Sequence, residues 1–326
     1  MRDVNGGGCV LDIDAAAVTE SIAEWIRTAV TERVRRKGIV VGLSGGVDSS
    51  VVAALCMRAL GAGRVLGLLM PETESSGDSL VLGRLAADSL GMATEVEDVG
   101  PMLDASGCYQ RRDDAIRTIV PEYGDGCKCK LVLADVLNTA AYQISYLVVE
   151  DPDGDQHRYR LTAESYLAIV AANNFKQRAR KMLEYYYADR LNYAVAGTPN
   201  RLEYDQGFFV KNGDGSADVK PIAHLYKTQV YQLAAYLGIP DEIRCRAATT
   251  DTYSLPQTQE EFYFILPYHK MDLCLWGRDN GIGAEETARL TQLSPAAVEK
   301  VYRIIDAKRS ATSWLHDPPL PRAAEL

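Results

Sequence analysis

A glycine-rich loop at residues 44–50 (SGGVDSS), set between a β-branched run and an apolar helix, constrains the fold more than any other feature. Residues 39–43 predict a buried strand, and residues 48–60 predict a helix that ends at Gly61. The alternation continues with a strand at 64–70, a helix at 80–90 and a strand at 94–99. This order indicates an α/β protein with a doubly wound, mostly parallel sheet covered by helices on both faces.

The loop has the composition of a phosphate-binding site. Its two glycines let the main chain approach a polyphosphate, and its amides and hydroxyls can donate hydrogen bonds at a helix N-terminus. Asp48 would repel bound phosphates unless a divalent cation lay between them, so the loop predicts a bound polyphosphate together with Mg²⁺. The alternative is a tight turn in which the glycines serve geometry alone. The loop residues that would contact this polyphosphate are Ser44, Gly45, Gly46, Asp48, Ser49 and Ser50.

The overall charge narrows the class of partner. The chain has 35 Lys plus Arg against 44 Asp plus Glu, a net charge of -9, which argues against nucleic acid and anionic membranes but allows free nucleotides. No apolar run reaches the roughly 20 residues of a membrane-spanning helix, and the N-terminus lacks the pattern of a secretory signal. Seven scattered cysteines indicate reduced thiols. We therefore expect a cytoplasmic protein.

The pattern in the second half of the chain is less regular. Runs at 145–150 and 156–161 flank a turn signal at 151–154 (DPDG) and predict an inserted β-hairpin. A long helix is expected at 166–191, a strand at 193–197 and two short helices within 284–314. The expected organisation is a flexible leader (1–13), one main domain (14–310) with an insertion at about 111–170, and a C-terminal tail (311–326).

The glycine-rich loop resembles the SGGxDS loop of the ATP pyrophosphatase superfamily, whose members adenylate a carbonyl or carboxylate and release pyrophosphate. Several families share this loop, so it does not identify one of them. Later segments resemble, in order and spacing, the ammonia-dependent NAD synthetase family. They are residues 174–180 (NFKQRAR), 197–203 (GTPNRLE), 207–218 (GFFVKNGDGSAD) and 221–230 (PIAHLYKTQV).

The resemblance implies roles for individual residues. Asp48 and Glu203 would hold Mg²⁺, which neutralises the charge that develops as pyrophosphate leaves. Asp214 and Asp218 would lie near the reacting carboxyl group and the incoming ammonia, although Asp214 also suits a simple turn. The residues that would contact ATP are those of the glycine-rich loop (Ser44, Gly45, Gly46, Asp48, Ser49 and Ser50) together with Arg178, Thr198, Lys227 and Thr249. The implied catalytic residues are Asp48, Lys227, Asp214 and Asp218.

By the same resemblance the chain is a carbon-nitrogen ligase. It would adenylate the carboxylate of nicotinic acid adenine dinucleotide with ATP, and ammonia would displace AMP to give NAD. No glutaminase motif is recognisable, so ammonia is expected from solution or from a partner. The resemblance also implies a homodimer whose interface helps to form the substrate site.

Some positions depart from the family pattern. Pro199 removes one loop amide, and residues 248–251 (ATTD) replace the usual Pro-Thr-Ala-Asp. The inserted hairpin is placed to cover the acyl-acceptor site. Amidation of another carboxylate and a catalytically silent nucleotide-binding module therefore stay as alternatives. For Cys127 and Cys129, whose CxC spacing invites a metal or redox interpretation, two structural thiols are favoured.

Overall fold

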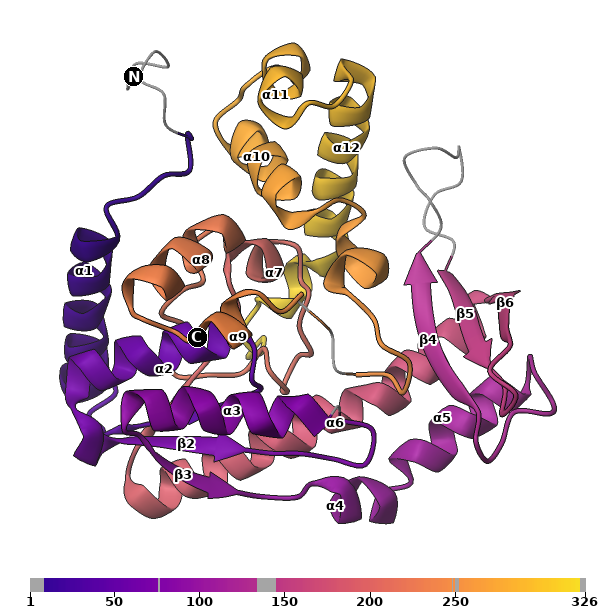
Figure 1. Ribbon diagram of the computed structural model, residues 1–326, viewed down its shortest axis with the longest axis horizontal. Coiled ribbons are helices and arrows are strands. Elements are labelled where there is room, and N and C mark those ends of the chain that lie inside the picture. The colour runs from indigo at the N-terminus through magenta and orange to yellow at the C-terminus, as the bar shows by residue number, and fades with distance from the viewer. Residues whose placement is uncertain (1–8, 76, 134–144, 248, 250–251, 323–326) are drawn as a thin grey trace.

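The computed structural model describes residues 9–75, 77–133, 145–247, 249 and 252–322. Within these residues a four-stranded parallel sheet has the order β3-β2-β1-β7 (Figure 1). This arrangement confirms the predicted α/β class, and the predicted strands lie within two or three residues of the observed ones. The strands are β1 (Ile39–Gly42), β2 (Val65–Leu69), β3 (Ala93–Val96) and β7 (Ala194–Ala196).

Helices cover both faces of this sheet, as the side-chain alternation of β1 requires. Ile39 and Val41 point into a core shared with one set of helices, whereas Val40 points into a second core on the other face. The first set comprises α1 (Ala15–Thr28), α2 (Val47–Leu60), α3 (Gly77–Leu90) and α8 (Lys227–Tyr236). The second comprises α4 (Gly100–Ala105), α5 (Cys108–Arg117) and α6 (Ala163–Leu191).

The predicted β-hairpin is confirmed, and it belongs to a larger antiparallel sheet. β5 (Ser145–Glu150) and β6 (Gln156–Arg160) pair with each other, and β4 (Lys128–Leu133), which was not predicted, pairs with β5. Gly154 closes the hairpin turn with a φ of +91° and donates its N–H to the Asp151 carbonyl at 3.0 Å. The buried face of this sheet packs against α5 and α6, apart from the core of the parallel sheet.

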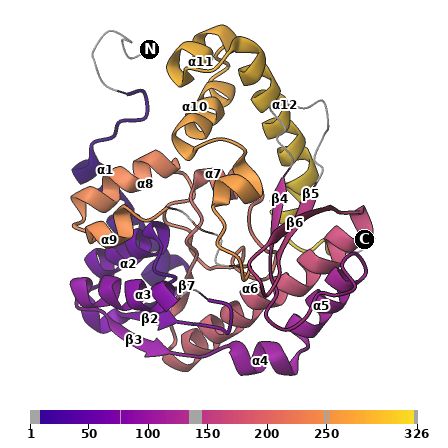
Figure 2. The same ribbon diagram turned by 45° about the vertical axis from the view of Figure 1, so that its right-hand side comes forward.

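Helix α6 connects the two sheets. It starts at a capping box in which Thr162 and Ser165 exchange hydrogen bonds, and it ends at Asn192, which has a left-handed φ of +57°. The helix runs from the antiparallel sheet along one face of the parallel sheet (Figures 1 and 2). Its residues can therefore contact segments that belong to both sheets.

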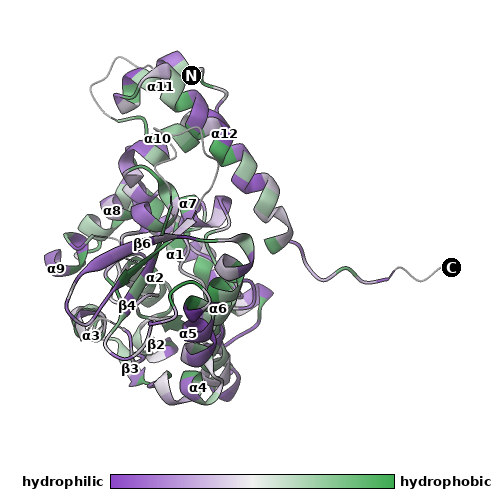
Figure 3. Ribbon diagram, turned by 90° about the vertical axis from the view of Figure 1, so that its right-hand side faces the viewer, coloured by the Kyte–Doolittle hydropathy of each residue, from purple (hydrophilic) through white to green (hydrophobic). Residues whose placement is uncertain are grey.

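Most of the remaining helices lie in the C-terminal part of the chain. α12 (Pro295–Thr312) is longer than the short helix expected there and runs past the predicted start of the tail, and residues 317–322 beyond it are exposed (Figure 3). Within the predicted flexible leader, Leu11 is buried and its carbonyl accepts hydrogen bonds from Gln229 and Gln232 of α8. None of the described helices is long and apolar enough to span a bilayer. The other helical segments are α7 (Arg201–Asp205), α9 (Asp241–Arg244), α10 (Tyr268–Asp279), α11 (Ala284–Thr291), π-helical turns at Ala29–Arg33 and Glu260–Phe264, and 3₁₀ turns at Ala62–Arg64 and Ser313–Leu315.

Candidate active site

The predicted phosphate loop joins the end of β1 to the N-terminus of α2. Gly45 has a φ of +76°, and a Cβ at this position would lie 2.7 Å from the Ser79 carbonyl oxygen, so only glycine fits without strain. The Ser49 hydroxyl donates to the Gly46 carbonyl at 3.0 Å and lies 3.2 Å from Ser44 Oγ. These contacts hold the loop at the start of a 14-residue helix, where free main-chain N–H groups attract anions.

Asn200 joins the two carboxylates that were predicted to share a metal ion. Its side-chain amide donates to Asp48 Oδ1 at 3.1 Å, and its main-chain N–H donates to Glu203 Oε2 at 3.2 Å. Asn200 Oδ1 also accepts the main-chain N–H of Glu203 at 3.1 Å, which completes a capping box at the start of α7. The structure therefore brings together carboxylates from distant parts of the chain.

A single buried lysine faces both carboxylates. Lys227 is the first residue of α8, is 2% exposed and forms an ion pair with Asp48. Its burial lowers its pKa, but Asp48 and Glu203 outweigh this effect and raise the pKa of Lys227 above its usual value. Burial and the charge of Asp48 raise the pKa of Glu203 to about 7, partly opposed by Lys227. Two carboxylates thus share one cation, so one negative charge remains for a second cation to neutralise.

These groups lie in the wall of a cavity of about 400 Å³. A second cavity of about 150 Å³ shares wall residues with the first, among them Ser44, Thr198 and Asp214. Burial raises the pKa of Asp214, whose Oδ1 accepts the Val210 N–H at 2.7 Å. The predicted site residues that line the larger cavity are Ser44, Gly46, Asp48, Ser49, Thr198, Glu203, Asp214, Lys227 and Thr249.

Four predicted residues line neither of these cavities. Gly45 serves the geometry of the loop, and the buried Ser50 hydroxyl donates to the Gly46 carbonyl at 2.9 Å. The Arg178 guanidinium donates to the Lys211 carbonyl at 3.4 Å. The exposed Asp218 accepts the Val195 N–H of β7 at 2.8 Å, which is a structural contact, and its catalytic role stays a prediction.

Sequence reasoning gave no role to Asn200, which joins the two carboxylates, or to Gln259 and Asn173, which line the larger cavity. Asn200 had a local signal, since Asn-x-x-Glu is a capping-box pattern. Gln259, which donates to Glu203 Oε1 at 2.9 Å, had none. Asn173 lines the cavity, is 3% exposed, and among the described residues neither of its side-chain polar atoms has a hydrogen-bond partner of ordinary geometry, although the Tyr253 hydroxyl lies near. An unsatisfied buried amide in a cavity wall is suited to bind a polar group of a ligand.

The described residues of the hairpin line neither cavity, so the structure does not place the hairpin over the site as expected. The antiparallel sheet instead supports residues 254–257 through β4. The Leu255 N–H donates to the Cys129 carbonyl at 3.1 Å, and the Ser254 hydroxyl accepts the Cys129 N–H at 2.9 Å. Cys129 is buried and both CxC thiols are free, and the described residues contain no cluster of three metal-binding side chains. The structural interpretation of these thiols fits this environment.

Asp272 of α10 stabilises the site from behind, and it provides a test that does not depend on activity. Its Oδ2 accepts the Thr228 N–H at 2.7 Å at the start of α8, next to Lys227, while burial raises its pKa from the ordinary 3.8 to about 6. Between these values the folded state binds more protons than the unfolded state, so stability falls as pH rises. We expect Asp272→Asn to remove on the order of 2–3 kcal/mol of this pH dependence. Urea unfolding at pH 4, 5, 6 and 7 measures it, and parallel curves for the two proteins would contradict it.

Comparison with known proteins agrees with this geometry. A family model described as NAD synthase matches residues 18–150 and 154–311, which includes most of the segment expected to be an insertion. The NH(3)-dependent NAD(+) synthetase of Mesorhizobium japonicum is 60% identical over 95% of this chain and 98% of its own length. The enzyme of the same name from Thermotoga maritima is 34% identical over 88% of this chain and 94% of its own length.

Solved structures share the fold at lower identity. NMN synthetase from Francisella tularensis matches with a TM-score of 0.66 and 22% identity, over 96% of this chain and all of that one. NH3-dependent NAD synthetase from Campylobacter jejuni matches with a TM-score of 0.62 and 22% identity, over 95% of this chain and all of that one. With a family model that spans most of the sequence and relatives at 34 and 60% identity, the chain belongs to the NAD synthase family.

Proposed function

We propose that this protein uses ATP and ammonia to convert the carboxylate of nicotinic acid adenine dinucleotide into the amide of NAD, with release of AMP and pyrophosphate. The names of the relatives at 60% identity support the reaction. The observation that carries the proposal is the placement of Asp48 and Glu203, joined by Asn200, beside the glycine-rich loop in one cavity. A site for leaving pyrophosphate needs this combination of anion-binding amides and metal-binding carboxylates.

The two adjoining cavities suggest where ATP binds. The smaller one is lined by Met70, Leu80 and the guanidinium-bearing Arg180, a mixture suited to a base and its ribose. Ser44 and Thr198 line both cavities, so a nucleotide in the smaller cavity would direct its phosphates toward the loop. The larger cavity then remains for the dinucleotide substrate, and Asn173 offers it an unsatisfied amide.

Asp48 and Glu203 fit a divalent cation. Mg²⁺ is commonly bound by one or two protein carboxylates, with substrate phosphates and water as the other ligands. Burial and, after it, the charge of Asp48 raise the pKa of Glu203, and a bound cation would relieve the repulsion between the two carboxylates. When bound, Mg²⁺ supplies charge neutralisation for the departing pyrophosphate.

The residues of the chain have separable roles in the proposed reaction. The substrate carboxylate attacks the α-phosphorus of ATP, and the amides and hydroxyls from Ser44 to Ser49 donate to the oxygens of the leaving pyrophosphate. Lys227, fixed by its ion pair with Asp48, adds a positive charge beside those oxygens. Ammonia then attacks the acyl-adenylate and AMP leaves. Asp214, half-buried and in the wall of both cavities, would accept a proton from the attacking nitrogen.

The test is an assay of the purified protein with ATP, Mg²⁺, ammonium and nicotinic acid adenine dinucleotide. We expect AMP, pyrophosphate and NAD in equal amounts. Nicotinic acid mononucleotide is the matched substrate control, because it has the same carboxylate without the adenylate half. Preference for the mononucleotide would support amidation of another carboxylate, release of ADP would contradict adenylation, and ATP binding without turnover would support a silent binding module.

We also propose a cytoplasmic homodimer. The seven free thiols support a reducing compartment. Helix α6 exposes Leu167, Met182 and Tyr186, each more than half accessible, and such side chains suit a subunit interface along this helix. The organisation into one main domain at 14–310 with an insertion at about 111–170 also stays a proposal.

A further inference from the structure

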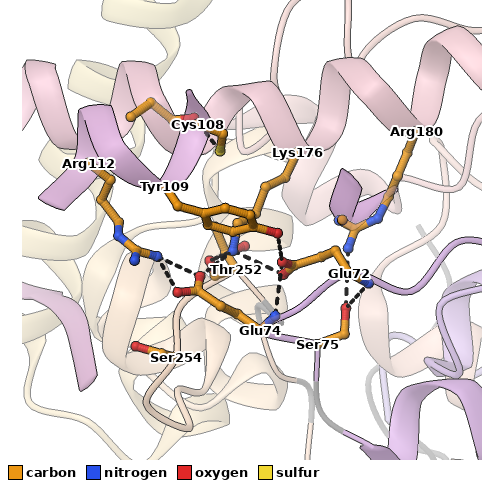
Figure 4. A network of polar contacts seen from close by, with 12 residues as sticks. Glu72, Glu74, Ser75, Cys108, Tyr109, Arg112, Lys176, Arg180, Thr252 and Ser254 are labelled. Atoms are coloured by element: carbon orange, nitrogen blue, oxygen red, sulfur yellow. Dashed lines mark hydrogen bonds and ion pairs between the residues drawn. The ribbon is translucent and has the colours of Figure 1, made fainter. Parts of the chain in front are cut away.

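A buried ion network lies beside the active site, and the proposed chemistry does not use it (Figure 4). Lys176 of α6 points between two carboxylates of the turn after β2, and its Nζ lies 3.0 Å from Glu72 Oε1 and 2.6 Å from Glu74 Oε2. The same Nζ donates to the Thr252 carbonyl at 2.9 Å. The side chain of Lys176 is 1% exposed and that of Glu72 is 0% exposed. One buried amine therefore contacts two segments that are far apart in the sequence.

A second cation belongs to this network and also pairs with Asp113. Arg112 of α5 forms an ion pair with Glu74, and the Tyr109 hydroxyl donates to Glu72 Oε2 at 2.6 Å. Burial raises the pKa of Glu74, but Lys176 and Arg112 outweigh it and hold that pKa below its usual value. Hydrogen bonds lie within the turn that carries the carboxylates: the Glu74 N–H donates to Glu72 Oε2 at 3.0 Å, and the Glu72 N–H donates to Ser75 Oγ at 3.2 Å. Lys176 is thus attached firmly on this side.

Both segments held by Lys176 belong to cavity walls. Pro71 and Ser75, on either side of the two glutamates, line the smaller cavity. Thr252 and Tyr253 line the larger one, as does Gln259, which donates to the proposed metal ligand Glu203. Between these contacts, residues 254–257 bond to β4.

We propose that Lys176 is a positioning residue, which connects the turn at 71–75 to the segment at 252–259. It thereby fixes the position of the wall of the larger cavity relative to the smaller cavity. This inference rests on the proposed function of the two cavities. Because Thr252 is bound through its carbonyl, the link depends on the lysine amine and not on the identity of residue 252. An ordinary structural ion pair would affect stability alone. A positioning residue also affects how much of the acyl-adenylate reacts with ammonia and how much is hydrolysed.

The test compares variants that keep the charge balance. Lys176→Met alone would leave Glu72 unpaired in the interior and could prevent folding, so the test variant is Lys176→Met with Glu72→Gln. Lys176→Arg is the conservative variant, because it retains a cation that can donate to the Thr252 carbonyl. Tyr109→Phe is the matched control, because it removes a buried hydrogen bond to Glu72 without touching Thr252.

Each variant is assayed at least about 10 °C below its melting temperature, so that all are folded. We expect the double variant to lower kcat about 10- to 100-fold, as misplacement of a site wall does, and to release more than one AMP per NAD, because water reaches the adenylate. Trypsin should cleave it faster after Arg246, which precedes the released segment. Tyr109→Phe should stay within about twofold of the unchanged protein in kcat, and Lys176→Arg should restore most of the AMP to NAD ratio.

Two outcomes would overturn the inference. One is a double variant that keeps the kcat, product ratio and tryptic pattern of Tyr109→Phe. The other is a fall in kcat with one AMP per NAD and unchanged cleavage after Arg246, which would leave Lys176 a stabilising residue only. Failure of the unchanged protein to form AMP and NAD would instead contradict the proposed function, and the two failures are therefore distinguishable.

Discussion

Replacing Asp48 with asparagine should lower kcat about 10²- to 10³-fold, the loss typical of removing one group that stabilises developing charge. Asparagine keeps the size of the side chain and can still contact Asn200, but it cannot neutralise a divalent cation. The effect on folding should be small, because Lys227 still faces the carboxylate of Glu203. The measurement is steady-state turnover over a range of Mg²⁺ concentrations, together with a thermal melt of each protein.

The control for Asp48→Asn is Asp306→Asn, which breaks the exposed ion pair with Arg278 outside both cavities. Exposed pairs of this kind contribute little, so Asp306→Asn should leave turnover and Tm close to those of the unchanged protein. Glu203→Gln should behave like Asp48→Asn in turnover, because Glu203 is the second proposed ligand. Near-native turnover of Asp48→Asn at limiting Mg²⁺ would contradict the assignment of Asp48 to the metal.

The glycine-rich loop shows which parts of the site were predictable from sequence. Its geometry is local: a strand end, a glycine with positive φ and a helix start follow one another in the chain, so periodicity and turn chemistry suffice to find it. Glu203 lies in another part of the sequence, and nothing in its own neighbourhood pairs it with Asp48. Only the resemblance to a family connected the two residues, and Asn200, which joins them, was given no role of its own although its spacing to Glu203 fits a capping box.

Strand β4 was missed although its pattern was present. Cys129 and Leu131 are buried while Lys128 and Lys130 are more accessible, the alternation expected of a half-buried strand. The CxC spacing of the two cysteines invites a metal or redox interpretation, and it obscures the alternation of buried and accessible side chains along the strand. The error concealed how residues 254–257 are held, because their hydrogen bonds go to this strand.

Asp218 and Lys176 show two different limits of sequence reasoning. Asp218 was predicted at the site and lines neither cavity, whereas Lys176 was given no role and contacts two cavity-wall segments. Asp218 lies four residues after Asp214 in an acidic turn, yet only Asp214 lines the cavities, because the Asp218 carboxylate accepts the Val195 N–H. Lys176 lies in a motif that resembled the family, but its partners come from two other segments of the chain. Which side chain of a motif faces a site is decided by tertiary contacts that no local pattern encodes.

Replacing Lys227 with methionine should destabilise the protein by about 3 kcal/mol, the lower end for a broken buried pair, because it leaves two half-buried carboxylates without their cation. Lys227 also lowers the pKa of Glu203. Its loss should therefore raise that pKa further and favour the protonated carboxyl group of Glu203 over the carboxylate. Turnover should fall with stability. The informative measurement is the increase of Tm with millimolar Mg²⁺ and no nucleotide, which should be larger for Lys227→Met than for the unchanged protein.

The reason is a competition between two cations for the same carboxylates. In the unchanged protein Lys227 already balances part of the charge of Asp48 and Glu203, so Mg²⁺ binds there more weakly. Without the lysine Mg²⁺ binds more tightly, and because it binds the folded state and not the unfolded state, it raises the stability of the folded protein more. The matched control is Lys308→Met, another buried lysine, whose amine donates to the Tyr263 carbonyl rather than to a carboxylate. Lys308→Met should show no added response to Mg²⁺. Equal Tm increases in Lys227→Met and Lys308→Met would show that the ion does not bind at Asp48 and Glu203, and would remove the physical basis for a metal at this site.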